Sequence, residues 1–195
     1  MKRQSRFLGF VALTLSTVIS GCAKERSAGA PCCPCLPAGR QPLDQALLSR
    51  LSTARSYHHQ VDILLRQGQR PSAIDRLKQL LASGLSDDWS ETREVRIDNT
   101  ARLAQLLLAE QGDGGEALVW VDRELAKPHP QSFYLANLHA VRGDILEARA
   151  KRIDKMGDKV EAKRWARQAI AAFERSIAIN KSLQARLKRK AQTKP

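Results

Sequence analysis

The hexapeptide GDGGEA at residues 112–117 recurs twice downstream, as GDILEA at residues 143–148 and as GDKVEA at residues 157–162. A weaker copy, GQRPSA, occupies residues 68–73. The glycine suits the left-handed backbone conformation that ends a helix. The aspartate suits the N-cap of the next helix, and the glutamate three residues later can complete a capping box. The small alanine lets that helix pack closely against its partner. Repetition of this turn therefore predicts a series of helices joined by tight connections.

The segments between these turns have helical periodicity. In residues 43–68, apolar and partly apolar side chains recur at alternating spacings of four and three, which marks one face of a helix: Leu47, Leu51, Ala54, His58, Val61 and Leu65. Asp44 is expected as the N-cap of this helix, and Gly68 as its stop. Further helices are expected in residues 70–84, 90–112 and 115–128, and from residue 131 onward. Ala and Leu are abundant and no alternating strand pattern occurs, so the fold class is all-α.

A second motif is AIAAFERSIAIN at residues 169–180, where Ala169, Phe173 and Ser176 have a small-large-small spacing. This motif and the repeated turn resemble the tetratricopeptide repeat family over roughly residues 50–182. Successive turn glycines are 44, 31 and 14 residues apart, against a family period of about 34. Because 14 residues cannot hold a full repeat, Gly143 is expected inside one long helix. The resemblance implies a TPR-like α-solenoid of about three irregular helix pairs ending in a long basic helix. An unrelated stack of helical hairpins is the alternative.

The resemblance also implies a binding surface. In the tetratricopeptide family, the first helix of each pair lines a groove that holds a peptide or a helix of another protein. The candidate groove residues are Tyr57, Gln60, Asn99, Arg102, Asn137 and His139.

The N-terminal stretch has the pattern of an export signal. Residues 1–6, MKRQSR, are basic, and residues 7–19 carry no charge. This apolar run is shorter than the roughly 20 residues that span a bilayer and fits a secretory signal peptide. It ends in ISGC at residues 19–22, which resembles the lipobox of bacterial lipoproteins. The resemblance implies cleavage before Cys22 and its acylation, and Ala23 in the next position points to the outer membrane. An ordinary signal peptide or an uncleaved anchor is the alternative.

The segment after Cys22 is rich in proline and cysteine. Residues 23–42 contain Pro31, Pro34, Pro37, Pro42, Gly29 and Gly39, which exclude a helix and favour a tether. Cys32, Cys33 and Cys35 include a C-x-x-C, but no βαβ pattern supports a redox site. Three thiols also fall short of the four ligands of a structural zinc site. The alternatives for these three cysteines are a disulfide, further acylation or no role. Because their number is odd, one thiol is left over, and a disulfide-linked homo-oligomer is a state to test.

The net charge of +13 is concentrated at the C-terminal end. Residues 149–195 hold 15 Lys/Arg against 4 Asp/Glu, whereas residues 22–148 hold 15 against 16. A helix here is expected to bury Val160, Trp165, Ala169, Ala172, Phe173, Ser176 and Ile177. Its basic side chains either solvate the end of the stack or contact an anionic surface; export leaves nucleic acid little opportunity. The candidate anionic contacts are Lys159, Lys163, Arg164, Arg167, Arg186, Lys188, Arg189 and Lys190.

The sequence carries no motif of catalysis or phosphate binding, and its histidines form no ligand set. No enzymatic activity, cofactor or metal is expected. The expected organisation is a lipoprotein signal peptide (1–21), a lipidated tether (22–42), a helical domain (43–182) and a basic tail (183–195). The expected function is a scaffold or assembly factor for an envelope complex, such as one for pili, secretion or polymer export, on the periplasmic face of the outer membrane. The alternative is direct binding of lipid headgroups, polysaccharide or nucleic acid by the basic end.

Overall fold

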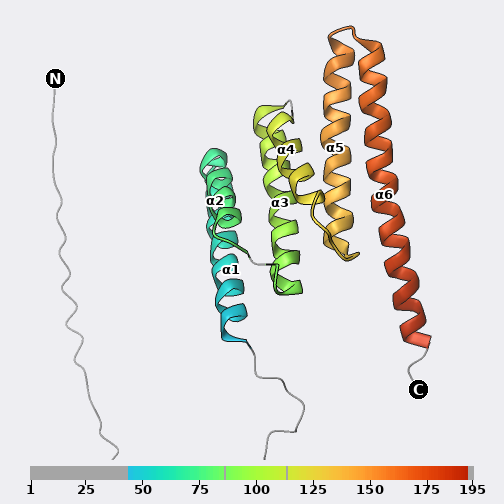
Figure 1. Ribbon diagram of the computed structural model, residues 1–195. Helices are drawn as coiled ribbons and strands as arrows, with labels where there is room; N and C mark the ends of the chain where they lie inside the picture. Colours follow the sequence, from blue (N-terminus) through green and yellow to red (C-terminus); the bar gives the residue numbers. More distant parts are fainter. Residues whose placement is uncertain (1–43, 86, 113, 193–195) are drawn as a thin grey trace, which may run out of the picture. The chain divides into compact units, whose positions relative to one another are not determined.

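The computed structural model describes residues 44–85, 87–112 and 114–192 (Figure 1). All regular structure in these ranges is helical, which confirms the all-α prediction. The helices are α1 (Gln45–Arg66), α2 (Arg70–Ala82), α3 (Ser90–Gln111), α4 (Gly115–Leu125), α5 (Phe133–Lys155) and α6 (Lys159–Gln192). The expected signal peptide and tether, with Cys22, Cys32, Cys33 and Cys35, lie outside the described residues.

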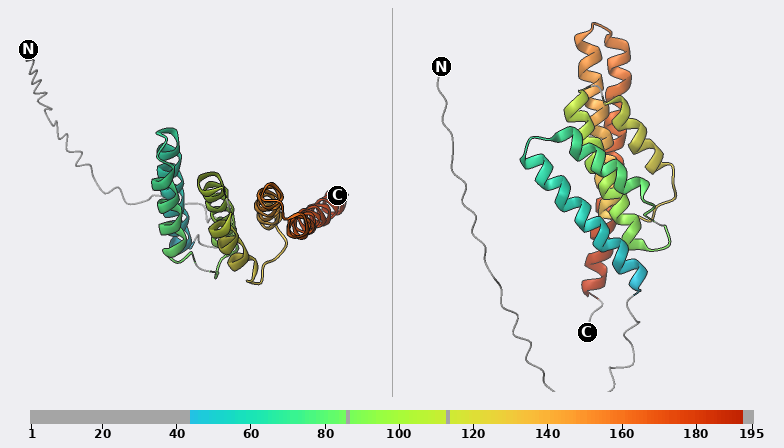
Figure 2. Two further views of the ribbon diagram at one scale, coloured as in Figure 1. Left: turned by 90° about the horizontal axis from the view of Figure 1, so that it is seen from above. Right: turned by 90° about the vertical axis from the view of Figure 1, so that its left-hand side faces the viewer.

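The helices pack as consecutive pairs (Figure 2): α1 with α2, α3 with α4, and α5 with α6. Between pairs, α3 packs against both α1 and α5, so the first helices of the three pairs are neighbours. The second helices pack forward, α2 against α3 and α4 against α5. The backbones of the second helices stay farther apart: α2 does not pack closely on α4, nor α4 on α6. Side chains still bridge the first of these gaps, where Nζ of Lys78 on α2 lies 2.6 Å from Oε1 of Glu116 on α4.

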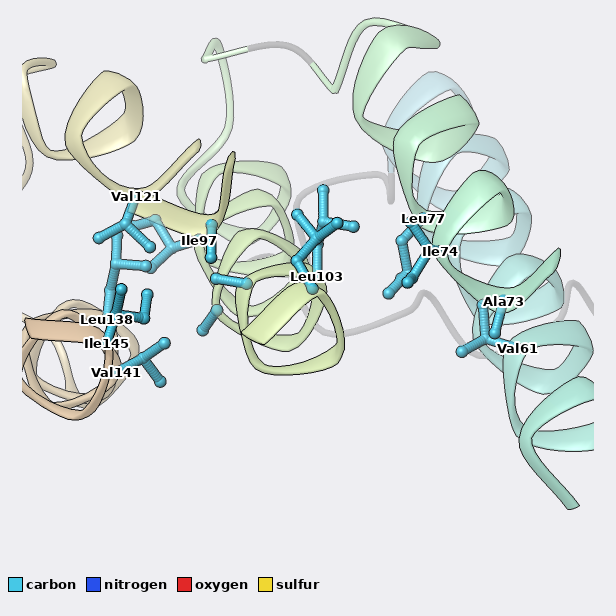
Figure 3. Packing of buried hydrophobic residues seen from close by; sticks show 14 residues of the cluster. Val61, Ala73, Ile74, Leu77, Ile97, Leu103, Val121, Leu138, Val141 and Ile145 are labelled. Atoms are coloured by element: carbon cyan, nitrogen blue, oxygen red, sulfur yellow. The ribbon is translucent and has the colours of Figure 1, made fainter. Parts of the chain in front are cut away.

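A continuous hydrophobic core runs from α1 to α5 (Figure 3). Val61 of α1 and Leu77 of α2 lie on one side of α3, and Val121 of α4 and Leu138 of α5 lie on the other. All four side chains are fully buried, and burial of such a side chain contributes about 1.5–3 kcal/mol. Leu103 of α3 belongs to the same cluster, so α3 joins the first pair to the third.

The turns follow the expected chemistry in part. Oδ1 of Asp44 accepts a hydrogen bond from the backbone N–H of Ala46 at 2.8 Å, which confirms the N-cap of α1. Gly68, Gly112 and Gly157 have φ angles of +73°, +72° and +93°, as helix-ending glycines should.

The first copy of the hexapeptide differs from the other turns. The N-cap of α4 is Gly114, which has no side chain to cap the helix. The aspartate expected as the cap of this copy, at position 113, lies outside the described residues. The third copy behaves as expected, because Oδ1 of Asp158 accepts a hydrogen bond from the N–H of Glu161 at 3.0 Å. The middle glycine, Gly143, lies inside α5, which confirms that the chain does not turn there.

The last helix differs from the sequence-based expectation in two respects. It runs unbroken to Gln192, so the boundary expected after residue 182 lies inside a helix. Ala169, Ala172 and Ser176 are buried as expected, whereas Val160 and Ile177 are 82% and 52% exposed. The assignment of those two side chains to the buried face was wrong. Among the described helices, the backbone of α6 packs closely only against α5, so few of its side chains are buried.

Candidate functional site

The six expected groove residues do not form one exposed surface. Asn99 is completely buried, and its Nδ2 donates a hydrogen bond to the carbonyl oxygen of Val95 at 2.7 Å. Tyr57 is half-buried and packs against the small cluster around Leu80 and Leu85. Gln60 and Asn137 are exposed, and Arg102 and His139 are half-buried. Asn99 and Tyr57 therefore support the domain from inside, and only the remaining four can face a partner.

Arg102 connects the first helices of two pairs. Its guanidinium on α3 forms an ion pair with Asp62 of α1, and its Nη1 lies 3.2 Å from Nδ1 of His58. The hydrogen bond from Arg102 lowers the pKa of Asp62. Burial, and then the charge of Arg102, lower the pKa of His58. These contacts hold α1 against α3. They also occupy hydrogen-bond donors of Arg102 that would otherwise be available to a partner protein.

A buried ion cluster lines a cavity of about 300 Å³ between α2, α3 and α4. Nε of Arg96 donates to Oε1 of Glu124 at 2.8 Å, and these side chains are only 7% and 6% exposed. Nη2 of Arg96 lies 2.5 Å from Oδ1 of Asp87. Nζ of Lys127 lies 2.8 Å from Oε2 of Glu124. The hydrogen bond from Arg96 lowers the pKa of Asp87. Asp87 precedes the N-cap of α3, which is Trp89.

A larger open cavity of about 540 Å³ lies between α4, α5 and α6. Its polar wall consists of Asp122 from α4, His139 and Arg142 from α5, and Arg175 from α6. Leu125, Ala126, Ala171 and Ala172 form its apolar wall. Nε of Arg142 donates to Oδ1 of Asp122 at 2.7 Å. Burial lowers the pKa of His139, and the charges of Arg175 and Arg142 add to that effect.

Sequence reasoning identified only His139 among the polar residues of this cavity. Asp122, Arg142 and Arg175 occur as ordinary charged positions on helices, with no motif around them. Their meeting depends on the packing of both α4 and α6 against α5. No local pattern in the sequence could have revealed it.

The eight basic residues singled out in the C-terminal helix are all exposed, but they do not converge on one pocket. Arg164 pairs with Glu161 at 3.4 Å within the helix. Nη2 of Arg186 donates to Oε1 of Gln131 at 2.6 Å, which joins α6 to the segment before α5. Lys159 and Lys163 border a smaller cavity of about 280 Å³ beside Lys151 and Asp154.

No family model, curated protein or solved structure matches this chain. Across the described ranges, no helix combines the length and the apolar character that a membrane crossing requires. The same part of the chain contains no group of three His, Cys, Asp or Glu side chains placed to hold a metal ion.

Proposed function

We propose that the protein is a membrane-anchored lipoprotein whose TPR-like helical domain holds or positions another envelope protein. The observation that carries this proposal is the order of packing: α1 lies against α3, α3 lies against α5, and each second helix packs on the first helix of the next pair. A tetratricopeptide-like α-solenoid has this order, and its function is to present the first helices as a continuous binding face.

The exposed side chains of the first helices suit a protein partner. Gln60 of α1 and Asn137 of α5 are exposed, and both are polar groups able to donate and accept hydrogen bonds. Phe133 and Tyr134, at the start of α5, are 52% and 42% exposed. Large aromatic side chains at a surface are typical anchors of protein interfaces.

The anchoring half of the proposal rests on the sequence. The ISGC stretch ending at Cys22 resembles a lipobox, and acylation of Cys22 would hold the chain on the periplasmic face of the outer membrane. More than one acyl chain gives stable attachment. Residues 23–42 then serve as a tether, whose twenty residues reach about 70 Å when extended. The helical domain can therefore meet its partner at a distance from the lipid surface.

In vivo photo-crosslinking of the full chain in its own membranes tests this function. A photoreactive residue in place of Asn137 is expected to form an adduct with another envelope protein, and the same residue at exposed Glu174 of α6 is the matched control. Cys22→Ser should release the chain from the membrane fraction and reduce the adduct, whereas Cys33→Ser should not. Adducts of equal yield from Asn137 and Glu174, or none from Asn137 and Gln60, would contradict the scaffold function.

Direct binding of an anionic ligand by α6 is the second candidate. Val160, Ile170 and Ile177 are 82%, 56% and 52% exposed on a helix that also exposes Lys163 and Arg167. Apolar side chains among basic ones suit the headgroup region of an anionic membrane. Under this function, Lys163→Glu with Arg167→Glu should abolish flotation of the chain with phosphatidylglycerol vesicles and leave the adduct at position 137 intact.

A further inference from the structure

The two cavities described above occupy equivalent places in consecutive helix pairs. One lies where α2 and α4 flank α3, and the other lies where α4 and α6 flank α5. Arg96 lines the first cavity, and it lies six residues after Ser90, the first residue of α3. His139 lines the second cavity, and it lies six residues after Phe133, the first residue of α5. In both places, therefore, a cavity lies between two second helices and the first helix that they flank. A basic side chain of that first helix lines the cavity each time.

The first of these cavities contains its own carboxylate. Glu124 reaches from α4 to Nε of Arg96 and also accepts from Lys127, so these two basic side chains are paired from within the chain. The third basic side chain of this cavity, Arg123, lies over the ring of Trp120. Both charges of the central pair are buried, which is tolerated only when hydrogen-bonding partners are complete. The first cavity thus shows a carboxylate on a helix bound to a basic side chain of the first helix.

The second cavity has one carboxylate, Asp122, and it pairs with Arg142 and not with Arg175. Asp122 satisfies Arg142 at its edge, and Asp122 is itself 46% exposed. Within the described residues, no carboxylate forms an ion pair with Arg175, and no acceptor is hydrogen-bonded to His139. Burial is the main cause of the lowered pKa of His139, and the charges of Arg175 and Arg142 add to it. An anion entering the cavity would meet Arg142, Arg175 and a ring N–H donor together.

We propose that the cavity between α4, α5 and α6 binds a glutamate or aspartate side chain from an acidic segment of the partner protein. This inference rests on the scaffold function proposed above, and it assigns the contact to a gap between second helices rather than to the face of the first helices. Arg142 and Arg175 supply charge-assisted hydrogen bonds, which are the strong ones. Leu125, Ala126, Ala171 and Ala172 accommodate the aliphatic part of the incoming side chain and its neighbours.

A peptide carboxylate fits better than a free inorganic anion or a lipid phosphate. Half of the lining residues are apolar, and the volume of about 540 Å³ exceeds the needs of a single ion. In the equivalent cavity a glutamate on a helix, Glu124, binds the basic side chain of Arg96 beside the apolar side chains of Leu81, Ala82 and Trp120. The cavity between α4, α5 and α6 has the same combination of basic and apolar walls.

Fluorescence anisotropy with the full chain in nonionic detergent micelles tests the proposal. The probe is a labelled peptide of six glutamates with both ends blocked, and the matched peptide of six glutamines controls for charge. Arg175→Gln is expected to weaken binding about tenfold or more, as the loss of a charge-assisted hydrogen bond requires. Arg164→Gln makes the same chemical change on an exposed part of the same helix, and should weaken binding less than about twofold.

A second variant guards against misfolding. Ala171→Trp fills the cavity but keeps every charge, and it should also weaken peptide binding, while Ala178→Trp on an exposed part of α6 should not. With histidine-labelled protein at constant pH, the glutamate peptide should shift the ring resonance of His139 and not that of exposed His59. Helical content measured by circular dichroism should be unchanged in each variant.

Several results would overturn the assignment. Arg175→Gln and Arg164→Gln could weaken peptide binding equally, the two peptides could bind with equal affinity, or the glutamate peptide could fail to bind. Arg175→Gln could also leave peptide binding intact and abolish binding to phosphatidylglycerol vesicles, which would assign the cavity to a lipid phosphate. The photo-crosslink from position 137 separates this inference from the scaffold function. If the crosslink persists when the peptide fails, only the cavity assignment falls. If the peptide binds and the crosslink is absent, the cavity stands without the scaffold.

Discussion

The ring of Phe173 on α6 lies directly against the backbone of Gly143 on α5. A Cβ placed on Gly143 would lie 2.5 Å from Cε1 of the ring and 2.7 Å from Cδ1 and Cζ. Real Cβ atoms do not approach carbon that closely, so α5 and α6 can be this near only because residue 143 has no side chain. The middle glycine of the repeated hexapeptide thus serves helix packing, whereas those at residues 112 and 157 end helices.

Gly143→Ala is therefore expected to destabilise the chain, although alanine is the better helix former. The gain in helix propensity is worth up to about 1 kcal/mol, and the forced displacement of the ring costs about 1–3 kcal/mol. Urea denaturation monitored by circular dichroism measures the difference. In a Phe173→Leu background the same substitution should cost less, because the smaller side chain removes part of the clash. A net gain in stability from Gly143→Ala in the unaltered chain would contradict the packing argument.

The sequence could predict helices and their ends but not this contact. Gly143 and Gly157 stand in nearly identical hexapeptides, and what separates their roles is an aromatic ring 30 residues further along the chain. Asn99 shows the same limit. It occupies a helix position that a partner could reach, yet α3 has neighbours on both sides and buries it. Local pattern determines which segments are helical, whereas the neighbours of each helix determine which polar residues remain at the surface.

The buried ion cluster gives a second prediction. Glu124→Gln removes the negative charge that faces Arg96 and Lys127 while keeping the size of the side chain. Because Arg96 is only 7% exposed, its charge would lose a buried partner, at a cost of about 3–5 kcal/mol. The measurement is the free energy of unfolding in urea. Glu110→Gln, at the exposed pair with Arg70, is the matched control and should cost no more than about 1 kcal/mol. Equal losses of unfolding free energy in the two variants would show that the buried ion pair stabilises the fold no more than the exposed one.

The cap of α6 gives a third prediction. Asp158→Ala removes the oxygen that accepts the N–H of Glu161, and should destabilise the chain by about 0.5–2 kcal/mol. Asp154→Ala tests the opposite sign, because Asp154 lies in the last turn of α5. A carboxylate there opposes the helix dipole, so its removal should be neutral or slightly stabilising. The pair of unfolding measurements separates capping from a general effect of lost negative charge near the turn.

The fourth prediction concerns acid sensitivity. The pKa values of His58 and His139 are lowered from their ordinary value near 6.5, in both cases chiefly by burial. On acidification the unfolded chain binds protons at these rings before the folded chain does, so the stability present above pH 6.5 is lost as the pH falls towards the folded-state pKa values. Each histidine contributes a slope of at most about 1.4 kcal/mol per pH unit, and solvent screening at half-buried positions reduces it.

Urea denaturation between pH 8 and pH 5 measures this slope, and His139→Gln should flatten it. His59→Gln is the matched control, because it makes the same change at an exposed position beside His58 on α1. Arg175→Gln should also flatten the slope in part. The charge of Arg175 contributes to the lowering of the His139 pKa, and its removal brings the folded-state pKa closer to the unfolded one. A slope that His139→Gln and Arg175→Gln leave unchanged would mean that His139 does not experience the positive charge that lines the cavity between α4, α5 and α6.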